Sequence, residues 1–248
     1  MIKKLVGALR FKDMRRKILI IGAILLVFRL LANIPIPGVN QEALAQFFGS
    51  NQYFGFLNIF SGGALSNLSI AMLGLGPYIT AVIIMQLLTM IFPRLKEMYY
   101  EEGEAGKAKF NRYSRYLTVP LAASSGYGFL KLLANQGIVG QSTPGQTFVN
   151  VLVVVAGSMF LVWLGELIDE QKIGNGTSIL IMAGIVSGLP IALRNALLSY
   201  QPNDITTYIS FVVLALVVIG GIVMLNEGER KVPVSYARRV RGNKLYGG

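Results

Sequence analysis

Six long apolar stretches, nearly free of charge, constrain this chain more than any other feature. A helix that crosses a bilayer core needs about 17–25 mostly apolar residues. The six stretches match that length and lie at residues 18–34, 68–92, 116–133, 148–164, 177–193 and 207–225. Because a membrane-crossing segment must satisfy its backbone polar groups internally, we predict an all-α integral membrane protein with six transmembrane helices.

The composition supports a membrane protein and excludes most enzymes. Hydrophobic residues make up 53% of the chain and charged residues 14%, against about 25% charged in soluble domains. The chain contains neither Cys nor His, which removes thiolate nucleophiles, imidazole bases and Cys/His metal sites. We therefore predict no enzymatic activity, no cofactor and no metal. No connection is long enough for a separate soluble domain, so residues 1–248 are predicted to form a single membrane domain.

The distribution of Lys and Arg predicts the orientation in the membrane. Seven precede the first stretch, six lie in residues 93–115 and six in residues 226–248, whereas residues 33–67 contain none. The positive-inside rule then places both ends (1–17 and 226–248) and the 93–115 loop in the cytoplasm. Arg29 lies within the first stretch. Its side chain either reaches the outer interface or serves as a structural or conduit-facing charge.

The second stretch has an unusual backbone, because Gly74, Gly76 and Pro77 fall within one turn. Such a break is tolerated in a membrane only where the freed backbone groups are buried in protein or face water. Leu75 and Ile79, with Ile83, recur at helical spacing. They form either an apolar constriction that excludes water or an ordinary helix-packing face.

Two shorter segments also stand out. Residues 53–67 are apolar but too short to cross, which is typical of a re-entrant segment or of an interfacial helix. In the 172–178 loop, Asn175 or Thr177 is expected to cap the fifth span. The basic segments 96–115 and 226–246 either only fix the orientation in the membrane or dock an anionic surface such as RNA phosphate. The net charge of +11 is suited to a partner that contains RNA or anionic lipid.

Seven short motifs, in order and in register along the chain, resemble the SecY family, the channel subunits of the bacterial general protein translocase. The motifs are Ile34–Gly38, Asn58–Ser66, Leu75–Ile79, Gln86–Thr89, Glu102–Gly106, Trp163–Glu166 and Ile173–Gly176. The resemblance implies a clamshell of ten helices, built from inverted repeats around an hourglass pore. This chain would correspond to spans one to six, with a short re-entrant plug helix in the 33–67 external loop.

The resemblance also implies site residues. The pore ring would receive Leu75, Ile79, Thr177 and Ile181, although Thr177 departs from the aliphatic residue common at that position. The lateral gate would include Thr80, Gln86, Ser124 and Ser125. The plug would consist of Asn58, Ile59, Phe60, Ser61, Gly62, Gly63, Ala64, Leu65, Ser66 and Asn67. Docking of the ribosome or motor would use Lys231, Arg238, Arg239, Arg241 and Lys244, while Asn243 stands where the family often has a second arginine.

The function implied by the resemblance is conduction of unfolded secretory polypeptides across the bacterial cytoplasmic membrane, with lateral release of apolar segments into lipid. The implied partners are the SecE and SecG subunits, the SecA motor, the ribosome with its rRNA, signal sequences and nascent chains, and membrane lipids. Two alternatives are a pore-less insertase or assembly scaffold, and one half of a solute carrier. The carrier would need a coupling charge at mid-membrane, and spans 2, 4, 5 and 6 contain none.

Overall fold

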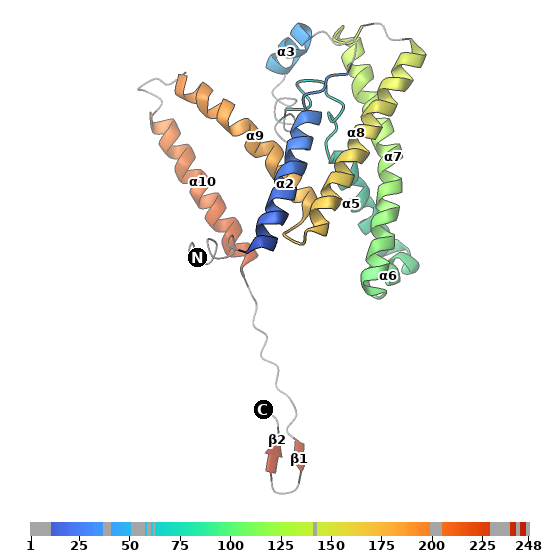
Figure 1. Ribbon diagram of the computed structural model, residues 1–248, viewed down its shortest axis with the longest axis vertical. Helices are drawn as coiled ribbons and strands as arrows, with labels where there is room; N and C mark the ends of the chain where they lie inside the picture. The colour runs from blue at the N-terminus through green and yellow to red at the C-terminus, as the bar shows by residue number, and fades with distance from the viewer. Residues whose placement is uncertain are drawn as a thin grey trace. The chain divides into compact units, whose positions relative to one another are not determined.

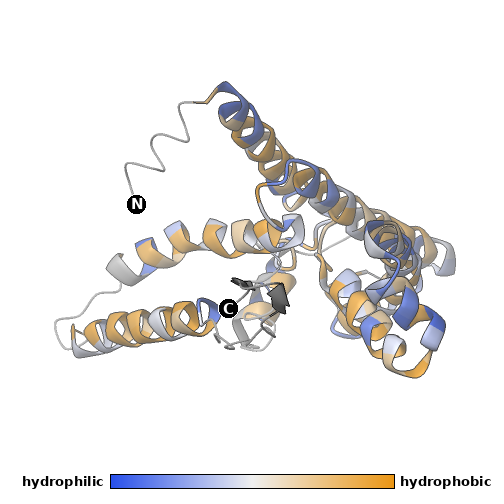
Figure 2. Cartoon of the chain, turned by 90° about the horizontal axis from the view of Figure 1, so that it is seen from below, coloured by the Kyte–Doolittle hydropathy of each residue, from blue (hydrophilic) through white to orange (hydrophobic). Residues whose placement is uncertain are grey.

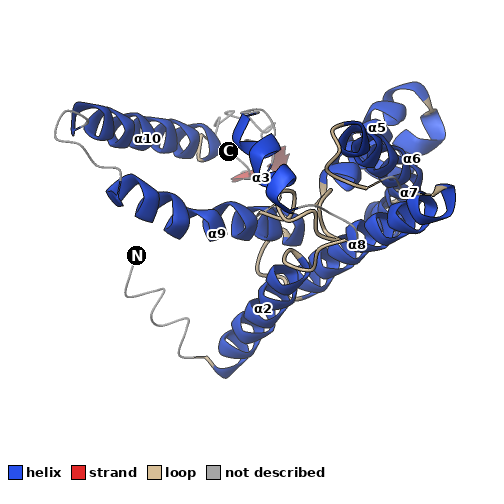
Figure 3. Ribbon diagram, turned by 90° about the horizontal axis from the view of Figure 1, so that it is seen from above, coloured by secondary structure: helices blue, strands red, loops and turns tan. Residues whose placement is uncertain are grey.

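The computed structural model describes residues 11–36, 41–50, 58, 61, 63–140, 143–198, 205–228, 239–241 and 244–246. Nearly all of them are helical (Figure 3). The chain forms two compact units, Met1–Leu193 and Arg194–Gly248. The prediction of a single membrane domain stays a prediction.

The first unit is a helical bundle (Figure 1). Its helices are α2 (Lys12–Leu31), α3 (Gln41–Ser50), α5 (Gly76–Ile91), α6 (Pro93–Tyr100), α7 (Gly103–Asn135), α8 (Pro144–Glu170) and most of α9 (Gly176–Leu198). Helix α7 packs along both α5 and α8, and α2 packs on α8.

The second unit contains α10 (Ile205–Asn226) and a small antiparallel hairpin of β1 (Arg239–Arg241) and β2 (Lys244–Tyr246). Helix α10 is apolar along most of its length (Figure 2). None of its most apolar window is buried within the structure, so its surface is suited to lipid. The hairpin lies in the segment predicted to be a basic tail.

Each predicted span overlaps a helix, but not every one of these helices is long and apolar enough to cross a membrane alone. Helix α8, residues Gly176–Asn195 of α9, and α10 are long and apolar enough. A fourth crossing is counted if α5 and α6, which bend by 114° at their junction, act as one. The helical membrane class is confirmed, whereas the number six stays a prediction. Charged residues keep α2 from being apolar enough to count as a span by composition. In α7, Pro120 and several small and polar residues have the same effect.

The second predicted span does not start as a helix, which corrects its boundary. Residues 68–75 form turns, and α5 begins only at Gly76, with Pro77 in its first turn. Leu68 and Gly74 have positive φ angles of 44° and 57°, which a right-handed helix cannot contain. The Gly-Pro pair therefore starts a helix, where a missing N–H costs nothing, and does not kink one.

Small residues let the helices approach closely. Every fourth residue of α5 from Pro77 to Thr89 is buried, and α7 has a matching buried stripe. The stripe on α7 consists of Gly106, Phe110, Ser114, Thr118, Ala122, Gly126 and Leu130. Small side chains are typical of helix interfaces in membranes, where packing and not water exclusion drives association.

Candidate functional site

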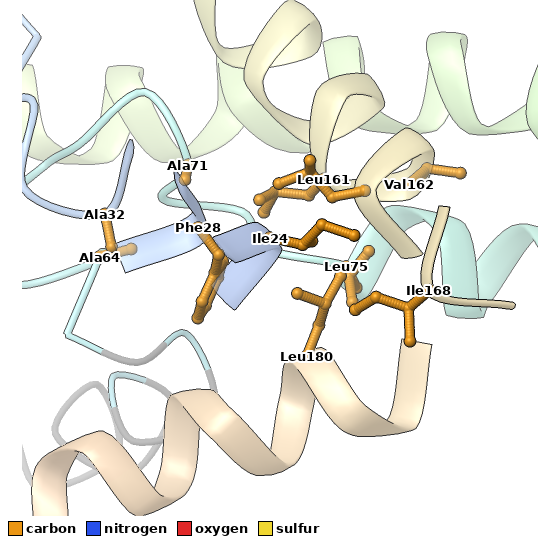
Figure 4. Close-up of a cluster of buried hydrophobic side chains, with 11 residues drawn as sticks. Ile24, Phe28, Ala32, Ala64, Ala71, Leu75, Leu161, Val162, Ile168 and Leu180 are labelled. Carbon is orange, nitrogen blue, oxygen red and sulfur yellow. The ribbon is translucent and has the colours of Figure 1, made fainter. Parts of the chain in front are cut away.

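A small pocket lies where the predicted plug, the start of α5 and the start of α9 come together. Its volume is about 20 Å³, which is room for about one water molecule. We call it the inner pocket; its lining is Phe28, Ser61, Gly74, Leu75, Leu161, Leu180 and Ile181. Most of these residues belong to a buried apolar cluster that joins α2, α8 and α9 (Figure 4). The inner pocket is therefore a small, mainly apolar space lined by five segments of the first unit, namely α2, the predicted plug, the residues before α5, α8 and α9.

The structure brings together two of the four predicted pore-ring residues. Leu75, only 7% exposed, and Ile181 both line the inner pocket. Ile79, one turn further along α5, is 40% exposed and does not line it. Thr177 lies in the first turn of α9, where its hydroxyl donates to the Asn175 side-chain oxygen at 2.7 Å. The ring as a set of four stays a prediction.

The predicted plug is held together by its own polar side chains. The Asn58 side-chain oxygen accepts from the Ser66 N–H at 2.9 Å, and the Ser61 hydroxyl accepts from the Leu65 N–H at 3.1 Å. Asn58 is helical, whereas residues 61 and 63–67 form turns, in which these side-chain bonds compete with helical ones. The short plug helix stays a prediction. Ile59, Phe60 and Gly62 lie outside the described residues. Ala64 is fully buried in the apolar cluster of the inner pocket.

The last residue of the predicted plug and the residues after it are hydrogen-bonded to the loop that follows α2. The Asn67 side-chain amide donates to the Asn33 side-chain oxygen at 3.3 Å. Backbone bonds run from the Ile36 N–H to the Leu68 carbonyl at 2.9 Å and from the Ile70 N–H to the Ile34 carbonyl at 3.1 Å. This short antiparallel pairing gives the Ile-Pro-Ile motif at residues 34–36 a structural role.

Helix α8 supports the non-helical backbone before α5, which the sequence reasoning missed. The Ser158 hydroxyl, 1% exposed, donates to the Gly74 carbonyl at 3.1 Å. A Cβ at Gly157 would overlap the carbonyl oxygen of Ile70. In the sequence, the small pair Gly157 and Ser158 within an otherwise apolar helix was the only signal that α8 supports the backbone before α5.

The turn between α8 and α9 gives a structural role to two of the SecY-like motifs, Trp163–Glu166 and Ile173–Gly176. Asn175 caps α9 by accepting from the Ser178 N–H at 3.0 Å, which confirms the predicted cap. Asp169 accepts from the Gly176 N–H at 2.6 Å. A Cβ at Gly176 would overlap the carbonyl oxygen of Gly165, so the two helices meet through backbone at this point.

Arg29 is bound inside the first unit. Its guanidinium donates to the Ser187 hydroxyl on α9 at 3.1 Å, and Ser187 donates in turn to the Gly184 carbonyl at 2.7 Å. A Cβ built on Gly63 of the predicted plug would lie 4.0 Å from the guanidinium. Of the two interpretations of Arg29, these contacts favour the structural charge.

The lateral-gate candidates lie on the two helices that pack together, and all four are exposed. Thr80 and Gln86 belong to α5, and Ser124 and Ser125 belong to α7. The hydroxyls of Thr80 and Ser124 donate to carbonyls of their own helices, at Gly76 and Leu121. Their gate role stays a prediction.

Only part of the predicted docking segment can be placed. Three of the five predicted residues lie in the hairpin of the second unit: Arg239, Arg241 and Lys244. In the register of the two strands, Arg241 lies opposite Lys244. Lys231 and Arg238 lie outside the described residues. The docking role stays a prediction.

Similarity of the fold to solved structures identifies the class of protein. It is similar to the canine channel solved as "Sec61 in the Canine ribosome-channel complex from the endoplasmic reticulum", with a TM-score of 0.55 and 20% identity over 87% of this chain and 48% of that one. It is also similar to a chain solved as "The structure of a protein conducting channel", with a TM-score of 0.56 and 20% identity over 92% of this chain and 51% of that one. The class is the multi-helix membrane fold of protein-conducting channels.

Sequence relatives define the family. The SecY family model matches residues 69–248. The Protein translocase subunit SecY of Pseudomonas aeruginosa is 43% identical over 90% of this chain and 51% of its own length. The SecY subunit of Streptomyces coelicolor is 41% identical over 97% of this chain and 58% of its length. The chain belongs to the SecY family, and it spans about half the length of the curated relatives it matches.

Proposed function

We propose that this chain contributes one wall of a protein-conducting channel, which passes unfolded secretory polypeptides and releases apolar segments sideways into lipid. The observation that carries the proposal is the inner pocket. Two predicted pore-ring residues, Leu75 and Ile181, and the predicted plug residue Ser61 line the same small apolar space. An apolar constriction of this kind is a barrier to ions because water is unfavourable inside it.

The chemistry of the spans fits this role better than the alternatives. A conduit for every side-chain type needs walls without fixed charges, since such charges would retain oppositely charged segments. A carrier half would need a coupling charge, and a pore-less scaffold would need no apolar ring. We propose that the chain catalyses no reaction itself, and that a motor or chain elongation supplies the energy.

The proposed setting is the bacterial cytoplasmic membrane, with the basic segments in the cytoplasm. The proposed partners are the SecE and SecG subunits, the SecA motor, the ribosome, signal sequences with their nascent chains, and membrane lipids. The relatives are named for protein translocation, and the canine structure is titled as a ribosome–channel complex. The excess of Lys and Arg in the predicted cytoplasmic segments supports contact with anionic partners.

Site-specific crosslinking in the intact protein tests the proposal. A stalled secretory chain is expected to crosslink to probes at Ile79 and Ile181. A matched probe at Leu216 of α10, which is 65% exposed, serves as the control and should not react. Crosslinks confined to Leu216 and other exposed apolar positions would contradict the channel function.

A further inference from the structure

A second pocket lies between the C-terminal turns of α7 and the first turns of α8. Its volume is about 60 Å³, and its lining is Leu130, Lys131, Ala134, Val139, Thr147 and Asn150. About 10–15 Å³ suffices for one water molecule, so this space accommodates a tetrahedral anion. It shares no lining residue with the inner pocket. It is therefore a separate candidate for binding.

Each of the three polar side chains that line this pocket can donate a hydrogen bond. Within the part of the chain that the structure describes, neither the Lys131 ammonium nor the Asn150 amide has a hydrogen bond or an ion pair. The Thr147 hydroxyl donates to the Thr143 carbonyl at 3.3 Å, a long bond that it can exchange for a better acceptor. Among the six residues that line the pocket, Lys131 is the one that carries a charge. The lining is therefore positive and rich in donors, which suits an acceptor-only anion.

The surroundings of the pocket indicate where the anion comes from. Exposed apolar side chains lie next to the polar ones in the sequence: Leu132 is 37% exposed, Phe148 64%, Val149 55% and Leu152 51%. Lys131 lies near the end of the third predicted span, and Thr147 and Asn150 lie at the start of the fourth. A phospholipid has this same arrangement, with an anionic phosphate beside apolar chains.

We infer that this pocket binds a phosphate group, supplied by the headgroup of an anionic phospholipid whose acyl chains lie against Phe148 and Leu152. The Lys131 ammonium and the Asn150 amide donate to the phosphate oxygens. Under the predicted orientation, the lipid belongs to the outer leaflet. The inference depends on membrane insertion and not on channel activity.

Lipid titration followed by native mass spectrometry of the intact detergent-purified protein tests the inference. Dioleoylphosphatidylglycerol is expected to bind more tightly than dioleoylphosphatidylcholine, which has the same chains and no net charge. K131Q should weaken phosphatidylglycerol binding at least about tenfold, as expected for a charge-assisted hydrogen bond. K172Q is the control, because Lys172 is an exposed lysine outside the pocket and outside the two basic segments, and it should bind as the parent does.

N150L serves as a second variant with the charge retained, and it should also weaken binding. Equal binding by K131Q and K172Q, or equal binding of the two lipids, would overturn the inference. Inorganic phosphate at millimolar concentration should not displace phosphatidylglycerol. Complete displacement would assign the pocket to free phosphate and overturn the lipid assignment. Because each readout is lipid retention, failure here leaves the crosslinking test of the channel unaffected.

Discussion

The Ser158 hydroxyl on α8 donates a 3.1 Å hydrogen bond to the carbonyl oxygen of Gly74, 84 positions earlier in the chain. Residues 68–75 form turns at the depth of a predicted span, and Gly74 lies just before α5 begins. In a membrane protein, a carbonyl freed from helical bonding needs a partner from elsewhere in the protein. Ser158 is that partner, so a side chain of one helix makes possible the interrupted start of another.

Replacing Ser158 with Ala is expected to lower the free energy of unfolding by about 1–3 kcal/mol, because it leaves the part-buried Gly74 carbonyl without this donor. Thermal unfolding of the purified protein measures the effect. Ser178→Ala is the control, because Ser178 is exposed and takes part in the helix cap through its backbone N–H. A melting temperature of the Ser158→Ala protein equal to that of the control would show that the bond contributes little.

Gly176→Ala is expected to destabilise the protein strongly, by about 1–3 kcal/mol or more, because the new Cβ would overlap the Gly165 carbonyl oxygen and backbone must shift. Gly165→Ala should be tolerated far better, since its Cβ would meet neighbours at 3.5 Å and beyond. Gly128→Ala, with nothing within 4 Å, is the neutral reference. Expression level and melting temperature rank the three variants. Any other order would mean that the two helices do not meet at Gly176.

Replacing Leu75 together with Ile79 by Ser is expected to raise the resting ion conductance of the intact translocase in a planar bilayer. The hydroxyls would let water wet the apolar constriction. Leu87→Ser, on the same helix and 54% exposed, is the control and should leave conductance unchanged. If the double variant conducts no more than the control, those two side chains do not form the seal.

Charge reversal at Arg238 and Arg239 is expected to weaken docking of ribosomes or of the motor. For ribosomes, each lost phosphate contact reduces the salt dependence, so the slope of log affinity against log salt should fall by about two. Cosedimentation across a salt series measures both quantities. Reversal at Lys12 and Arg15, which lie in the other basic terminus, is the matched control. Unchanged docking at every salt concentration would mean that the basic segment 226–246 only fixes the orientation in the membrane.

Much of the fold was predictable because membrane solvation acts on local sequence. The apolar stretches predicted the helices, and the Asn175 cap and the interruption near Gly74 were predictable from residue types alone. The motifs in register predicted the family. The exact start of α5 was not predictable. Leu68 adopts a positive φ that its side chain disfavours, and its carbonyl accepts a hydrogen bond from the distant Ile36 N–H.

The sequence by itself determined that this chain is a helical membrane protein of the SecY family, since apolar length, charge placement and motif order are all local properties. Tertiary structure decided which residues meet. It placed Leu75, Ile181 and Ser61 around one pocket, paired Arg29 with Ser187, and brought Lys131 and Asn150 together at a second pocket. Such contacts join residues that are far apart in the chain, and their formation depends on the packing of whole helices, which no local pattern encodes.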